Sequence, residues 1–164
     1  MDSPRVTIDL PDDPDATERL GERIGARLRP GDTLALTGTL GAGKTTFVRG
    51  LARGLDVDDP EEVSSPTYLL VIEHAGPTPL LHADAYLPAK LEGFLADGGL
   101  EYLFDPARVV AVEWAERVAN LLPEKTLWVE LALGEVPGRR VSLRADEPGA
   151  FPWLQEIATI ADGD

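Results

Sequence analysis

The sequence contains no cysteine and only two histidines, His74 and His82, among its 164 residues. Without cysteine the chain can form no disulfide, no thiolate nucleophile and no cysteine-ligated zinc site. Two histidines also argue against a metal centre built from imidazole ligands. Any metal ion that the protein uses is therefore expected to be held by oxygen atoms.

A long apolar run and a basic surface are also missing. No stretch approaches the ~18 apolar residues that a membrane span requires, and residues 1–15 are acidic and punctuated by proline, unlike an export signal. We therefore predict a cytoplasmic protein without membrane association. The formal net charge of -14 repels a phosphate backbone, so any contact with tRNA or other RNA is expected to be indirect. The simpler interpretation of this charge is a solvated, solubilising surface.

Length and composition predict one folded domain over residues 1–164. Hydrophobic residues make up 43% of the chain and charged residues 27%, as in ordinary globular proteins. A chain of this length buries roughly two-thirds of the surface that its unfolded form exposes. No internal repeat, low-complexity tract or linker divides it.

The apolar pattern predicts an α/β fold. A first helix is expected from residues that recur every four positions, with its cap at Asp15 or Thr17: Ala16, Leu20, Ile24 and Leu28. Short, almost wholly apolar runs typical of strands covered on both faces follow at residues 33–37, 68–72, 80–83 and 109–112. These runs predict a mostly parallel sheet flanked by helices. Alternation in residues 127–132 and 140–144 predicts a C-terminal β-hairpin, followed by a short closing helix.

Residues 38–45, GTLGAGKT, match the phosphate-binding pattern G-x-x-x-x-G-K-[ST] at every fixed position. They lie between a predicted strand and a predicted helix, which is the context that this P-loop motif requires. Glycines allow backbone N–H groups to converge on an anion, and the start of a helix directs the positive end of its dipole there. We therefore expect Gly41, Ala42 and Gly43 to cradle the phosphates. The alternative is a glycine-rich turn carrying a surface lysine.

The side chains after these glycines have distinct expected roles. Lys44 is expected to reach the β- and γ-phosphates of ATP as a point charge. The Thr45 hydroxyl is expected to coordinate a Mg²⁺ ion that bridges the same phosphate oxygens. Thr46 would add contacts near the α-phosphate. ATP and Mg²⁺ are thus the predicted cofactors.

Two acidic residues, Asp84 and Glu113, each follow an apolar strand. Ligands of open parallel sheets bind at the carboxyl ends of strands, so both carboxylates are expected near the phosphates. Either one could hold Mg²⁺, through its water shell if not directly, or orient the attacking water, and the sequence does not divide these roles. The alternative for each is to cap the segment that follows it. For His82, a hydrogen-bonded strand histidine is favoured over a catalytic one.

Two neighbouring features have less specific interpretations. Trp114 directly follows Glu113 and is read as a core aromatic close enough to the metal to report on bound nucleotide. The hydroxyls in residues 64–68, SSPTY, could sense the γ-phosphate as a switch, or the segment could be an ordinary turn into a strand.

Four segments, in this order along the chain, resemble the TsaE family, the P-loop ATPases of bacterial threonylcarbamoyladenosine tRNA modification. They are GAGKTTF at residues 41–47, SPTY at 65–68, HADAY at 82–86 and VEW at 112–114. The resemblance covers about residues 5–145. It implies a single P-loop NTPase domain and an ATPase that is weak without its partners.

The resemblance also implies specific roles. Thr45 and Glu113 would bind Mg²⁺, Asp84 would support hydrolysis, and Thr17 would lie near the nucleotide base. The implied partners are the TsaB and TsaD proteins, with ATP hydrolysis serving the carbamoyl-transfer cycle on the tRNA and no direct action on RNA.

One position departs from the family pattern. The family commonly has an arginine directly after the tyrosine of HADAY, and this chain has Leu87 there. Three arginines are candidates to supply the missing charge, and the sequence does not select among Arg49, Arg53 and Arg140.

Two other functions share the P-loop. A small-metabolite kinase would need an arginine-bearing lid over the transferred phosphoryl group, and no such segment is evident. A non-catalytic switch protein would bind ATP only to order residues 64–68 for a partner. A GTPase is disfavoured because no N-K-x-D sequence follows the loop.

Overall fold

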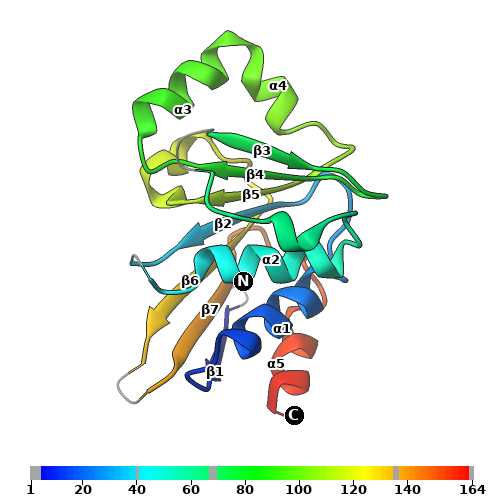
Figure 1. Ribbon diagram of the computed structural model, residues 1–164, viewed down its shortest axis with the longest axis vertical. Helices are drawn as coiled ribbons and strands as arrows, with labels where there is room; N and C mark the ends of the chain where they lie inside the picture. Colours follow the sequence, from blue (N-terminus) through cyan, green and yellow to red (C-terminus); the bar gives the residue numbers. More distant parts are fainter. Residues whose placement is uncertain (1–4, 40, 67–69, 135–136, 163–164) are drawn as a thin grey trace.

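Seven strands form one sheet in the computed structural model, which describes residues 5–39, 41–66, 70–134 and 137–162 (Figure 1). The strand order is β1-β7-β6-β2-β5-β4-β3. The strands are β1 (Arg5–Leu10), β2 (Thr33–Thr37), β3 (Val71–His74), β4 (Leu80–Asp84), β5 (Val109–Glu113), β6 (Thr126–Leu133) and β7 (Arg139–Ala145). The four central strands, β6, β2, β5 and β4, run parallel, whereas β3 and the β7–β1 pair join antiparallel at the two sides.

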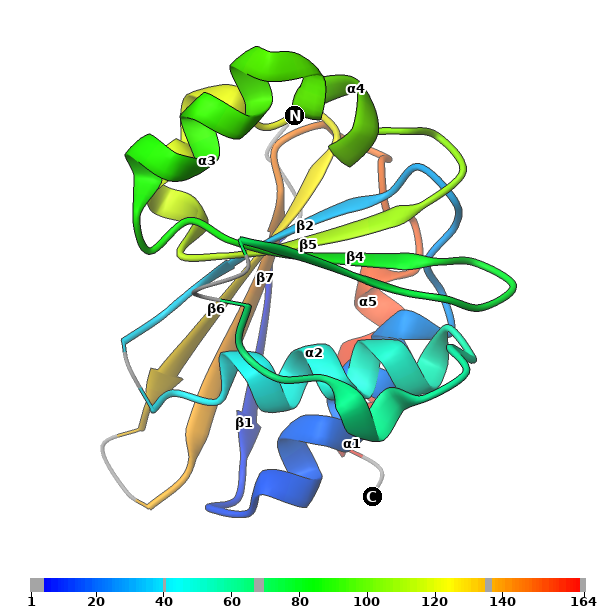
Figure 2. The same ribbon diagram turned by 45° about the horizontal axis from the view of Figure 1, so that its top comes forward.

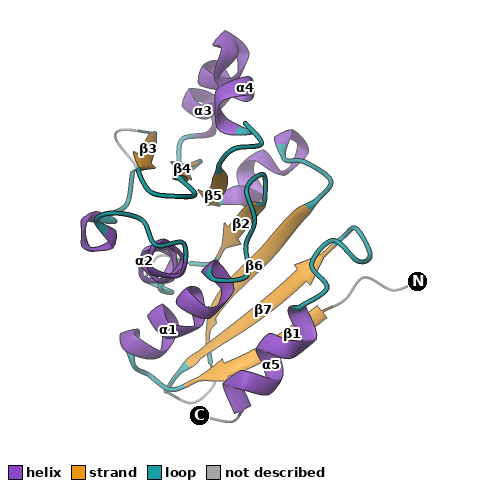
Figure 3. Cartoon of the chain, turned by 90° about the vertical axis from the view of Figure 1, so that its right-hand side faces the viewer, coloured by secondary structure: helices purple, strands orange, loops and turns teal. Residues whose placement is uncertain are grey.

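Helices cover both faces of this sheet. They are α1 (Pro14–Gly25), α2 (Lys44–Gly54), α3 (Pro88–Phe94), α4 (Leu100–Leu103) and α5 (Leu154–Asp162), with 3-10 turns η1 (Pro60–Glu62) and η3 (Ala115–Leu121) and a π-helical turn η2 (Leu95–Gly99). Figure 2 shows α1 and α2 on one side of the sheet and α3 and α4 on the other. In Figure 3, α5 lies beside β1, next to the face that α1 covers.

The predicted α/β class, parallel centre, C-terminal hairpin and closing helix are confirmed, with three local differences. The expected strand at residues 68–72 is observed as β3, and residues 67–69 lie outside the described part of the chain. The predicted cap of the first helix is wrong. Asp13 caps α1, accepting a hydrogen bond from the Asp15 backbone at 3.0 Å, because Pro14 suits the first helical position, where no N–H is needed. The helix also ends at Gly25, before Leu28.

The sheet separates two apolar cores, and β2 contributes to both. Leu34 and Leu36 pack in the core beneath α1, α2 and α5, whereas Ala35 lies in the core beneath α3 and η3. Side chains of a strand alternate between faces, so a strand with an apolar centre at residues 34–36 is suited to this central position. The strand that precedes the P-loop is therefore anchored from both sides.

Helices α1 and α2 approach each other unusually closely, through glycines on both. A Cβ atom added to Gly50 would lie 2.1 Å from the carbonyl oxygen of Glu18, and one added to Gly21 would lie 2.3 Å from that of Phe47. Gly25 and Gly54 have backbone contacts of the same kind. Since α2 begins at Lys44, this contact positions the helix that starts at the P-loop.

Among the described residues, no helix combines the length and apolar character needed to cross a membrane.

Candidate functional site

The carboxyl ends of β2, β4 and β5 meet at one edge of the sheet because the three strands are parallel. The P-loop follows β2 at this edge. Asp84, at the end of β4, lies directly opposite Glu113, at the end of β5, and Glu113 lies opposite Leu36 of β2. The register therefore brings both predicted carboxylates beside the loop.

The described part of the P-loop has the conformation that its glycines permit. Gly43 caps α2 with a φ of 105°, in the left-handed region that favours glycine, and no side chain caps the helix. Gly38 has a φ of 141°, and an added Cβ there would lie 2.4 Å from the Leu131 carbonyl oxygen. The first N–H groups of α2 are thus left without a capping side chain, as at helix ends that bind anions.

Lys44 is bonded to the loop itself. Its Nζ donates to the carbonyl oxygens of Gly38 at 2.6 Å and Thr39 at 3.0 Å, and lies 4.1 Å from the centre of the Trp114 ring. Burial lowers the pKa of the Lys44 ammonium, against the opposing effect of nearby carboxylates, among them Glu113. Phosphate oxygens would have to replace two carbonyl acceptors at this ammonium.

Thr45 and Glu113 face each other. The Thr45 hydroxyl lies 3.3 Å from each of the two carboxylate oxygens of Glu113. Behind Glu113, the Nε2 atom of the fully buried His82 is in hydrogen-bond contact with the Oε2 atom of that carboxylate. His82 is thus a hydrogen-bonded strand histidine, and its contact restricts how the Glu113 carboxylate is oriented.

Asp84 has a different set of contacts. Its Oδ1 accepts from the backbone N–H of Tyr86 at 2.7 Å, and its Oδ2 accepts from the Ser65 hydroxyl at 3.3 Å. The Asp84 carboxylate therefore ties the segment around Ser65 to the end of β4. Of the predicted switch, residues 64–68, the last two lie outside the described part of the chain.

A cavity of about 660 Å³ collects most of the predicted site residues. Its lining comprises Gly41, Gly43, Lys44, Thr45, Thr46, Ser65, Tyr86, Glu113, Trp114 and Arg117. Asp84 is not in this lining, although its partner Ser65 is. Ala42, also predicted at the site, is buried in the core at 1% exposure.

Thr17 lines a smaller cavity of about 200 Å³, together with Gly41, Gly43, Thr46 and Arg139. The Thr17 side chain lies close to the loop: a Cβ added to Gly43 would lie 3.5 Å from the Thr17 Cγ2 atom.

The sequence did not identify Arg117 as a site residue. The three arginines considered for the charge missing at Leu87 have contacts elsewhere: Arg49 with the Val63 carbonyl, Arg53 with Glu18 and Glu61, and Arg140 with Asp9. Arg117 instead lies in η3 and donates to the carbonyl oxygen of Tyr86, next to Leu87. Its spacing of three residues from Trp114 was the available signal, because a helical turn brings such positions together.

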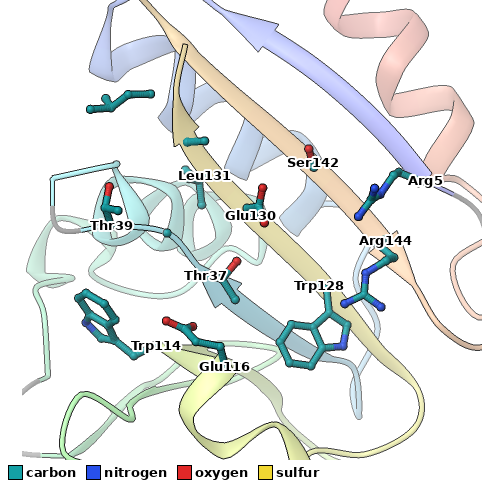
Figure 4. Close-up of a pocket in the computed structure, with 13 residues that line it drawn as sticks. Arg5, Thr37, Thr39, Trp114, Glu116, Trp128, Glu130, Leu131, Ser142 and Arg144 are labelled. Atoms are coloured by element: carbon teal, nitrogen blue, oxygen red, sulfur yellow. The ribbon is translucent and has the colours of Figure 1, made fainter. Parts of the chain in front are cut away.

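A larger depression of about 750 Å³ adjoins the loop on the sheet face that α1 and α2 leave uncovered (Figure 4). Gly38, Thr39 and Trp114 line it near the loop. Farther along β6 and β7, the guanidinium of Arg144 lies 5.4 Å from the Trp128 ring. The depression therefore shares one wall with the P-loop.

Comparison with known proteins gives a consistent result. A family model described as threonylcarbamoyl adenosine biosynthesis protein TsaE matches residues 11–141. A tRNA threonylcarbamoyladenosine biosynthesis protein TsaE from Treponema pallidum is 43% identical over 115 residues, spanning 70% of this chain and 83% of the relative. One of the same name from Bacillus subtilis is 35% identical over 133 residues, spanning 80% and 81%. The crystal structure of YdiB from Bacillus subtilis is similar with a TM-score of 0.76 and 28% identity, covering 99% of both chains.

Proposed function

The chain belongs to the TsaE family of tRNA threonylcarbamoyladenosine biosynthesis proteins, and we propose that it serves this modification by binding and hydrolysing Mg²⁺-ATP beside Lys44. One observation carries the proposal. At the start of α2, next to the buried Lys44 ammonium, the Thr45 hydroxyl faces both carboxylate oxygens of Glu113 at 3.3 Å. A cationic group and a pair of hard oxygen ligands on one cavity wall suit a metal-bound triphosphate.

The Thr45–Glu113 pair fits the geometry of a magnesium site. Oxygen ligands in adjacent octahedral positions, each at about 2.1 Å from Mg²⁺, are about 3 Å apart, close to the observed separation. Among the described residues, no cluster of three or more histidine, aspartate or glutamate side chains could enclose a metal. This agrees with an ion that takes Thr45 and Glu113 from the protein and its other ligands from phosphate and water. Bound there, Mg²⁺ would neutralise charge on the β- and γ-phosphates.

The contacts suggest how the two carboxylates divide their roles. Glu113 lines the cavity and is oriented by His82, so we assign it to the metal and its water shell. Asp84 contacts Ser65, so we assign it to positioning the segment that would meet the γ-phosphate. Lys44 would exchange its two carbonyl acceptors for β- and γ-phosphate oxygens. We place the adenine near Thr17, on the family resemblance.

Hydrolysis at this site would transfer the γ-phosphoryl group of ATP directly to water. The oxygen of a water molecule bonds to the γ-phosphorus as the bond from that phosphorus to the bridging oxygen breaks. The electron pair of the broken bond stays on the β-phosphate oxygen of ADP. One proton of the water stays on the attacking oxygen and the other passes to a γ-phosphate oxygen, so that both leave with inorganic phosphate. We further propose that TsaB and TsaD are the partners that use this cycle, and that tRNA is contacted only through them.

Replacing Thr45 by valine tests the site, because valine keeps the shape and removes the hydroxyl. Loss of a hydrogen-bonding group at a charged partner is worth about 1.5–3 kcal/mol, so ATP affinity in Mg²⁺ should fall tenfold or more, with less change in EDTA. Thr7→Val, on the exposed edge strand β1, is the matched control. Calorimetric titration of ATP measures both, and Lys44→Ala should abolish productive binding. Unchanged Mg²⁺-dependent affinity in Thr45→Val would refute the assignment.

A further inference from the structure

Arg117 and Lys44 are the two cationic side chains in the described lining of the 660 Å³ cavity. The Arg117 guanidinium carbon lies 4.8 Å from the centre of the Tyr86 ring and 4.9 Å from that of Trp114. Lys44 lies against the same Trp114 ring. Two positive groups from different elements, α2 and η3, therefore converge on one indole at the cavity wall.

No carboxylate in the described part of the chain forms an ion pair with Arg117. Its one hydrogen-bond acceptor there is the backbone carbonyl of Tyr86, a neutral group, and the side chain is exposed. Arg108 and Arg139, by contrast, pair with carboxylates. Contact with the two aromatic rings holds the guanidinium at the cavity and leaves N–H groups of its planar fork for a bidentate acceptor such as phosphate.

We propose that Arg117 is a catalytic residue that contacts the terminal phosphate of ATP from within the same chain. This inference rests on the proposed function. During the hydrolysis step described above, negative charge spreads over the oxygens of the transferred phosphoryl group, and an arginine beside them stabilises that state. Lys44 acts from the start of α2, and Arg117 acts from η3. Tyr86 and Trp114 keep its guanidinium at the cavity when nucleotide is absent.

A purely structural role is the competing account, since Arg117 also bonds to Tyr86. Arg117→Gln separates the two, because the glutamine amide retains N–H donors for the carbonyl while losing the charge. Arg108→Gln is the matched control. Arg108 stacks on Tyr102 at the same 4.9 Å and pairs with Glu73, but it directly precedes β5, at the opposite end from Glu113.

The decisive measurement compares ADP with the ADP–aluminium fluoride–Mg²⁺ complex, which imitates the transferred phosphoryl group. We expect Arg117→Gln to leave ADP affinity within about twofold of wild type, to weaken the aluminium fluoride complex at least tenfold, and to lower kcat by about 100-fold or more. Arg117→Lys should recover part of the loss, and Arg108→Gln should leave all three quantities unchanged.

Equal weakening of ADP and of the aluminium fluoride complex, or an unchanged kcat in Arg117→Gln, would overturn the inference. Failure of the proposed function gives a different result, in which wild-type protein does not bind Mg²⁺-ATP or Lys44→Ala hydrolyses it equally well. If wild-type protein hydrolyses ATP, Lys44→Ala does not, and Arg117→Gln hydrolyses it as fast as wild type, only the role of Arg117 is rejected.

Discussion

Gly50→Ala tests whether the close approach of α1 and α2 holds the P-loop helix in place. In an ordinary helix interior, alanine is more favourable than glycine by about 0.5–1 kcal/mol. At Gly50 the added Cβ would lie 2.1 Å from the Glu18 carbonyl oxygen and 2.9 Å from both the Glu22 nitrogen and the Gly21 Cα. All three neighbours are backbone atoms of α1, so no side chain can rotate away. The two helices would have to separate.

The net effect follows from these opposing contributions. Overpacking of a tight interface typically costs about 1–3 kcal/mol. Contacts of 2.1–2.9 Å with rigid backbone atoms are expected to cost about 3 kcal/mol or more. After the propensity gain is subtracted, we expect Gly50→Ala to lower the free energy of unfolding by about 2 kcal/mol. This is a large share of the ~5–15 kcal/mol of a typical domain.

Urea unfolding followed by far-UV circular dichroism measures this change. Gly93→Ala in α3 is the matched control, because nothing beyond the neighbouring backbone of its own helix lies within 4 Å of its added Cβ, and this variant should be stabilised by up to ~1 kcal/mol. Because α2 begins at Lys44, Gly50→Ala should also weaken ATP binding, whereas Gly93→Ala should not. A Gly50→Ala protein as stable as wild type would refute the close backbone contact between the helices.

Two further predictions concern the histidines. Burial, followed by the effect of His82, lowers the pKa of His74 below its usual value of 6.5, so below about pH 6.5 the unfolded chain binds more protons at this position than the folded chain. Wild-type protein should therefore lose stability relative to His74→Gln as the pH falls from 7.5 to 5.5 in urea unfolding; parallel pH profiles would contradict this. His82→Phe should weaken the Mg²⁺-dependent part of ATP binding about 10-fold or more, because the contact that orients Glu113 is lost. His82→Gln, which keeps a donor, should lose less in the same calorimetric titration, and equal losses in the two variants would show that the contact with Glu113 is unimportant.

Much of the fold was predictable because its signals lie in contiguous residues. The apolar centre of β2 is followed closely by the glycines of the P-loop, so strand, loop and helix could be identified together. The antiparallel addition of β3 was not predictable in this way. Its short sequence is compatible with either direction, and only the hairpin-like return into β4 determines it.

At the candidate site, the sequence alone determined which residue types follow which strands: Lys44 and Thr45 after β2, Asp84 after β4 and Glu113 after β5. Local periodicity and turn chemistry suffice for this, because they act between near neighbours in the chain. Only the tertiary structure decided that Glu113 faces Thr45 while Asp84 turns to Ser65, that Arg117 reaches the cavity, and that glycines bring α1 against α2. These relations depend on strand register and on packing between distant segments, and the local spacing of Arg117 and Trp114 indicates only that those two side chains are neighbours.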